Sequence, residues 1–97
     1  MLSNTEVVRK NLETSLEACF ARLESVRAVT TPAHKAFGYA NFATPLLESA
    51  QSYLHAGDGE GAELRVQDAS GWISEAQEYL TRAESDLHTV VPETVSL

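Results

Sequence analysis

The stretch that decides the fold is residues 62–87, which read AELRVQDASGWISEAQEYLTRAESDL. Apolar residues recur in it at alternating steps of four and three, at Ala62, Val66, Ala69, Ile73, Ala76, Leu80, Ala83 and Leu87. This spacing places them on one face of an α-helix, and no β-strand produces it. Alanine holds every seventh position, with larger aliphatic side chains between. We therefore predict a long amphipathic helix over about residues 60–88.

Residues 32–56 carry a weaker version of the same pattern, at Ala36, Ala40, Ala43, Leu47, Ala50 and Leu54. Small residues on two facing helices let the axes approach toward the short end of the ~8–10 Å range. We therefore predict a tight, alanine-seamed antiparallel hairpin, closed by the glycine-rich turn at residues 57–61. Pro45 cannot donate a backbone hydrogen bond. Residues 32–56 are thus either one helix kinked at Pro45 or two helices, the second capped by Thr44.

Residues 4–29 are predicted to form a further helix, whose apolar face holds Val8, Leu12, Leu16, Cys19, Leu23 and Val26. Ser3 and Glu6 have the spacing of a capping box at its start. The short connection at residues 30–32 favours an antiparallel neighbour. The expected architecture is a single all-α domain, residues 1–97, folded as an antiparallel three-helix bundle (up-down-up). Residues 89–97, which include Pro92, are predicted to be a flexible tail.

A second stripe of large side chains flanks the hairpin seam, and it consists of Tyr39, Leu46, Tyr53, Trp72 and Tyr79. Equal offsets of the same sense project from the same side of an antiparallel pair, so these residues are expected to form one apolar shelf. We predict that the leucine-rich face of residues 4–29, together with Phe20, covers it.

The hairpin turn resembles a tetratricopeptide-repeat hairpin over about 25 residues. The resemblance rests on Leu46, Ala50, Tyr53, Gly57, Asp58, Ala62, Val66 and Ala69. A shift of about 34 residues finds no second copy, and such repeats need neighbours to be stable. We carry no repeat function over from this resemblance.

The charges are unevenly distributed. Residues 1–55 hold five acids and five bases, residues 56–97 hold nine acids and two bases, and the chain carries a net charge of −7. Because contact with phosphates needs a basic patch, no direct nucleic-acid binding is expected, whereas a basic protein is a suitable partner. No apolar run approaches the ~20 residues of a membrane span. Nothing at residues 1–10 is typical of a signal peptide, and Cys19 is the only cysteine, so we expect a cytoplasmic location.

The sequence does not predict catalysis, a metal site or a cofactor. His34, His55 and His88 are far apart in the sequence, and Cys19 falls on the apolar stripe. Metal binding needs several ligands at one point, and a cysteine nucleophile needs surroundings that lower its pKa. Acidic pairs at helical spacing, such as Glu75 and Glu78, are typical of a solvated face. We therefore expect that the protein is not an enzyme.

Two sets of residues are candidates for partner binding. The first is aromatic and consists of Phe37, Tyr39, Phe42, Trp72 and Tyr79, and the second is acidic and consists of Glu63, Asp68, Glu75 and Glu78. The alternative, which the residue types themselves favour, is that the rings belong to the core and that the acids form a solvated face.

Three hypotheses follow for the function. The first is a non-catalytic protein–protein interaction module that self-associates into a homo-oligomer. The second is an acidic inhibitor or decoy that binds the basic site of another protein. The third is small-ligand binding between the helices, in a pocket lined by Tyr39, Phe42 and Trp72.

Overall fold

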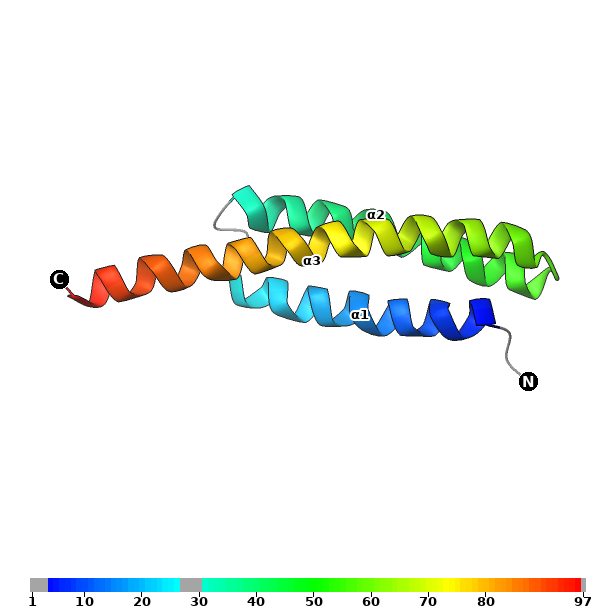
Figure 1. The fold of residues 1–97 in the computed structure, drawn as a ribbon, viewed down its shortest axis with the longest axis horizontal. Coiled ribbons are helices and arrows are strands. Elements are labelled where there is room, and N and C mark those ends of the chain that lie inside the picture. Colours follow the sequence, from blue (N-terminus) through cyan, green and yellow to red (C-terminus); the bar gives the residue numbers. More distant parts are fainter. Residues whose placement is uncertain (1–3, 27–30, 97) are drawn as a thin grey trace.

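The structure is a computed structural model that describes residues 4–26 and 31–96, with side chains through Asp86. It holds three helices, α1 (Asn4–Val26), α2 (Thr31–His55) and α3 (Gly59–Ser96). They lie side by side in an elongated antiparallel bundle measuring 60 × 22 × 15 Å (Figure 1). The predicted all-α bundle is thereby confirmed. The capping box at Ser3 and the end predicted for the first helix lie outside the described residues.

The buried seam between α2 and α3 is made of alanine. Nine alanines on the two helices are at most 1% exposed: Ala33, Ala36, Ala40, Ala43, Ala50, Ala62, Ala69, Ala76 and Ala83. Larger side chains sit between them, with Leu47 on α2 and Ile73 and Leu80 on α3. A methyl side chain keeps two helix backbones close, and α2 and α3 make the most extensive contact in the bundle. The sequence predicted this seam correctly.

The turn between α2 and α3 satisfies its backbone groups within a few residues. Gly57 takes a left-handed conformation (φ 83°), and the N–H groups of Gly57 and Asp58 donate to the carbonyls of Leu54 and Tyr53. This pattern is a Schellman motif, which ends a helix without leaving its last carbonyls unpaired. Asp58 then caps α3, because its carboxylate accepts the Gly61 N–H at 2.9 Å. One aspartate therefore closes α2 and opens α3.

Pro45 lies inside one continuous helix, so the interpretation of residues 32–56 as two helices was wrong. Both Pro45 and Asn41, whose carbonyl loses its usual donor, are exposed. The hydroxyl of Thr44 donates to the Ala40 carbonyl at 3.3 Å, one residue away. Because the missing hydrogen bond faces outward, water can replace it and the helix continues.

The end of α3 differs from the sequence-based expectation. The helix runs through Pro92 to Ser96 rather than ending near residue 88, and its C-terminal end extends beyond α1 and α2 in Figure 1. No glycine or asparagine precedes Pro92 at residues 84–91 to stop the helix, and proline removes only its own N–H donor. The flexibility of residues 89–97 stays a prediction.

Candidate interaction surface

The position of α1 decides which hairpin face is open. Phe20 of α1 packs edge-on against Phe37 of α2, with ring centroids 6.3 Å apart. Arg22 of α1 forms a two-point ion pair with Glu84 of α3, at 2.6 and 3.0 Å. At 3.6 residues per turn, Phe37 lies about 160° around α2 from Tyr39. Glu84 lies about 140° around α3 from Tyr79 by the same rule.

It follows that α1 packs on the side opposite the shelf, and the prediction that it covers the shelf was wrong. The α1 side of the hairpin carries the small residues Thr44 and Ser70, both half-buried, at the same helical positions as Phe37 and Glu84. Small side chains at these positions let a neighbouring helix approach closely. On the shelf side, the large aromatic rings project from the hairpin and leave less room for a third helix.

The rings on the open side contact one another, and we call Tyr39, Phe42, Trp72 and Tyr79 the aromatic face. Tyr39 stacks on Trp72 with centroids 5.4 Å apart and also meets Tyr79 at 5.5 Å. Phe42 meets Trp72 at 5.1 Å. Phe42 is nevertheless 56% exposed and Trp72 36%. Four of the five aromatic candidates are thus brought together, whereas Phe37 lies on the α1 side.

Cations border one end of the aromatic face. The Lys35 Nζ lies 5.3 Å from the Tyr79 ring centroid, and the Arg82 guanidinium carbon lies 5.0 Å from it. Arg82 also pairs with Glu78 at 2.8 Å. At the other end, Arg65 lies over the Tyr53 ring, 5.3 Å from its centroid. The aromatic face therefore combines apolar area with positive charge, whereas the candidate residues chosen from the sequence were rings and acids and included no base.

The four acidic candidates do not form one surface. Asp68 and Glu75 are exposed and seven residues apart, so they project from the same side of α3, next to the aromatic face. Glu78 forms an ion pair with Arg82. Glu63 lies toward α1, where it lines an open pocket of about 360 Å³ with Asn4, Thr5, Val8, Val66 and Gln67. The residues proposed to dock a basic partner are therefore divided between two sides of the helix.

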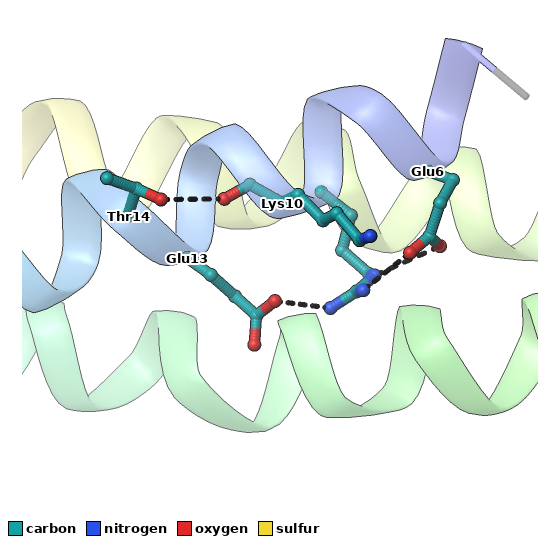
Figure 2. A network of polar contacts seen from close by, with 5 residues as sticks. Glu6, Lys10, Glu13 and Thr14 are labelled. Carbon is teal, nitrogen blue, oxygen red and sulfur yellow. Dashed lines mark hydrogen bonds and ion pairs between the residues drawn. The ribbon is translucent and has the colours of Figure 1, made fainter. Parts of the chain in front are cut away.

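Arg9 is a buried charge that sequence reasoning missed. Only 4% of the residue is exposed, and it donates to Glu6 at 2.6 and 3.2 Å and to Glu13 at 2.6 Å (Figure 2). These hydrogen bonds hold the pKa of the Glu6 carboxyl below its ordinary value of 4.5. The pKa of Arg9 is raised, chiefly by its bond to Glu6. Spacings of three and four residues signal such ion pairs, but burial depends on tertiary packing.

The histidine, cysteine and acidic side chains were also candidates for a metal site or a nucleophile. No group of three histidine, cysteine or acidic residues among the described side chains could hold a metal ion. Cys19 is 1% exposed, and burial raises the pKa of its thiol above 9.0, which keeps it protonated and unreactive at neutral pH. A second open pocket, of about 330 Å³, is lined by Glu60, Glu63, Leu64 and Gln67. Neither pocket is lined by Tyr39, Phe42 or Trp72.

The comparisons with known proteins add no relative: no family model matches the chain, and no match is found among curated proteins or solved structures. Within residues 4–26 and 31–96, no helix is long and apolar enough to cross a membrane.

Proposed function

We propose that this protein is a non-catalytic protein–protein interaction module that self-associates through its aromatic face. The observation that carries the proposal is the exposure of Phe42 (56%) and Trp72 (36%) on the side of the hairpin that α1 leaves open. Aromatic residues and arginine are enriched at the centres of protein interfaces, where they dominate the binding energy. Tyr39, Tyr79 and Arg82 supply more of the same residue types within one patch.

Packing within the patch supports its role as a binding surface. The rings are held by one another at 5.1–5.5 Å and by Lys35 and Arg82 over Tyr79. A surface ordered before binding loses less side-chain entropy when the partner arrives.

We also propose that the protein acts in a reducing compartment such as the cytoplasm, since Cys19 is its only cysteine and is buried.

The test is molar mass by light scattering after size-exclusion chromatography, on the full chain over a range of concentrations. We expect a species heavier than the 10.6 kDa monomer. Phe42→Ala should reduce it to the monomer. Phe37→Ala is the matched control, because it removes a similarly exposed ring (51%, against 56% for Phe42) from the α1 side of α2. A wild-type chain that stays monomeric at every concentration overturns the proposal, and so does equal loss of the oligomer in both variants.

A further inference from the structure

A second stripe of residues runs along α3 beside its alanine seam. Its members follow one another at alternating steps of three and four residues, and we call them the outer seam: Arg65, Asp68, Trp72, Glu75, Tyr79, Arg82 and Asp86. Such steps keep side chains on one side of a helix, as in a coiled coil. Arg65 and Tyr79 are half-buried and the other five residues are exposed. The outer seam is therefore an open stripe that includes the α3 half of the aromatic face.

The charges of the outer seam are arranged so that the seam complements itself when it is reversed. At its start Arg65 precedes Asp68, and at its end Arg82 precedes Asp86. Against a reversed copy aligned near Glu75, Arg65 falls opposite Asp86 and Asp68 opposite Arg82. The same alignment places Trp72 opposite Tyr79. Each end of the seam thus meets charges of opposite sign, with rings on rings in the middle.

We propose that the partner of the aromatic face is a second copy of this chain, with the two α3 helices antiparallel and a two-fold axis near Glu75. The proposal rests on the self-association proposed above and adds its geometry. A two-fold interface is isologous, so each contact occurs twice. The interface contains two Arg82–Asp68 pairs, two Arg65–Asp86 pairs and two Trp72–Tyr79 contacts. Arg65 and Asp86 stand about 31 Å apart along the helix at ~1.5 Å per residue, so the proposed contacts extend over that length of α3.

Parallel arrangements bring like charges together. If two α3 helices ran parallel in register, Arg65, Asp68 and Arg82 would each face its own copy. If α3 instead lay over the α2 of a parallel copy, Arg82 would face Lys35, because both cations lie over Tyr79 in one chain. Like charges facing each other across an interface are destabilising, so charge favours the antiparallel arrangement.

The middle of the interface contains one favourable and one unfavourable element. Tyr39 contacts both Trp72 and Tyr79, so it lies level with the midpoint of the seam and extends the ring contact onto α2. Glu75 lies beside the two-fold axis, where it approaches Glu75 of the second copy. This repulsion weakens the dimer and makes it reversible. Removing the charge at Glu75 should therefore strengthen association.

Charge exchange in the full chain tests the arrangement. Asp68→Arg places a new arginine against Arg82 of the second copy, and Arg82→Asp places a new aspartate against Asp68 of that copy. We expect each variant to raise the dimer dissociation constant at least about tenfold in analytical ultracentrifugation. The double variant, Asp68→Arg with Arg82→Asp, should recover most of the affinity. Glu75→Gln should lower the dissociation constant below that of the wild type.

Glu24→Arg is the matched control, since it makes the same charge change as Asp68→Arg at an exposed position of α1. It should leave the dissociation constant within about twofold, and circular dichroism should show every variant helical. Recovery in the double variant supports the antiparallel seam. Failure to recover, or equal weakening by Glu24→Arg, overturns it. If these charge changes have no effect while Phe42→Ala still abolishes the oligomer, the antiparallel geometry fails and the interaction through the aromatic face stands.

Discussion

The two interfaces of this bundle are built from different materials. The α2–α3 interface is a seam of buried alanines with Leu47, Ile73 and Leu80 between them. The interface of α1 relies on leucines such as Leu16 and Leu23 and on the ion pair of Arg22 with Glu84 of α3, and it also buries Arg9, which pairs within α1. In the hairpin, the small alanine side chains let the two helix backbones pack close together. On α1, longer side chains make the contact with the hairpin, and Arg9 and Arg22 pair with carboxylates.

The contact of α1 with the hairpin is also less extensive than the contact between α2 and α3. A close-packed seam of small residues cannot relax, because its atoms are fixed to the backbone. A helix held by long side chains can shift to fill a gap. Substitutions in the two interfaces should therefore have unequal effects, even when the chemistry of the change is the same.

The largest difference is expected for leucine truncation. Leu80 is 0% exposed in the hairpin and Leu16 is 7% exposed on α1. We expect Leu80→Ala to lower the free energy of unfolding by about 3–4 kcal/mol and Leu16→Ala by about 2 kcal/mol, because the hairpin cavity cannot collapse. Urea unfolding followed by circular dichroism measures both. Equal losses would contradict the contrast between the two interfaces.

A smaller loss is expected from the Arg9 network. The arginine is the buried member, whereas the Glu6 and Glu13 side chains are 19% and 47% exposed. The double variant Glu6→Ala, Glu13→Ala leaves a buried cation without these partners and should be clearly destabilising, though less than Leu80→Ala. Arg9→Met leaves two carboxylates that reach water and should cost less. If thermal unfolding ranked Arg9→Met as the more damaging change, the cost would lie in the removed arginine and not in its unpaired charge.

Two glycines of α3 should respond in opposite directions to the same substitution. A Cβ on Gly61 would lie 2.7 Å from the Asp58 Oδ2 and 2.9 Å from the Tyr53 Cδ1, whereas one on Gly71 would meet nothing within 4 Å. Gly71→Ala should stabilise by about 0.5–1 kcal/mol because alanine loses less backbone entropy in a helix. Gly61→Ala should lose that gain and destabilise by about 1 kcal/mol as the cap shifts. Stabilisation of both variants would show that the turn tolerates a side chain.

The smallest effect is expected from acid. Because Arg9 lowers the pKa of Glu6 in the folded state, the carboxylate stabilises the fold above the ordinary carboxyl pKa of 4.5. This contribution is lost as the pH falls through the lowered folded pKa, since the unfolded chain takes up the proton more readily. Melting temperatures measured from pH 7 down to about pH 3 should fall less steeply in Arg9→Met than in the wild type. Parallel curves would exclude a contribution from Glu6.

The sequence predicted the features that depend on local pattern. The helices, the alanine seam and the turn at residues 57–61 follow from steps of three and four and from glycine chemistry, which act within a few residues. The side chosen by α1 could not be predicted in the same way. A leucine-rich helix can pack on either side of a hairpin, and the structure places α1 on the side that carries the small residues Thr44 and Ser70 and not on the side of the large rings.

The candidate site residues show the same difference between what local pattern predicts and what tertiary packing decides. Tyr39, Trp72 and Tyr79 were grouped correctly because they share one offset from the seam. Phe37 and Glu63 instead lie toward α1, away from the other candidates, because their angle around the helix differs from that of the rings. Arg9 looked like an ordinary surface arginine, and only the packing of α1 against the hairpin shows that it is buried.

The ion pairs of Arg9 also bear on the order in which the chain is made. Synthesis produces α1 first, and about 60 residues separate its end from the last described side chains of α3. At a synthesis rate of ~5–20 residues per second, the leucine-rich face of α1 is exposed for several seconds before the hairpin that buries it has been made. Glu6 and Glu13 lie three and four residues from Arg9, so these pairs can form on α1 alone. The ion pairs of Arg9 can therefore form on α1 before α2 and α3 have been synthesised.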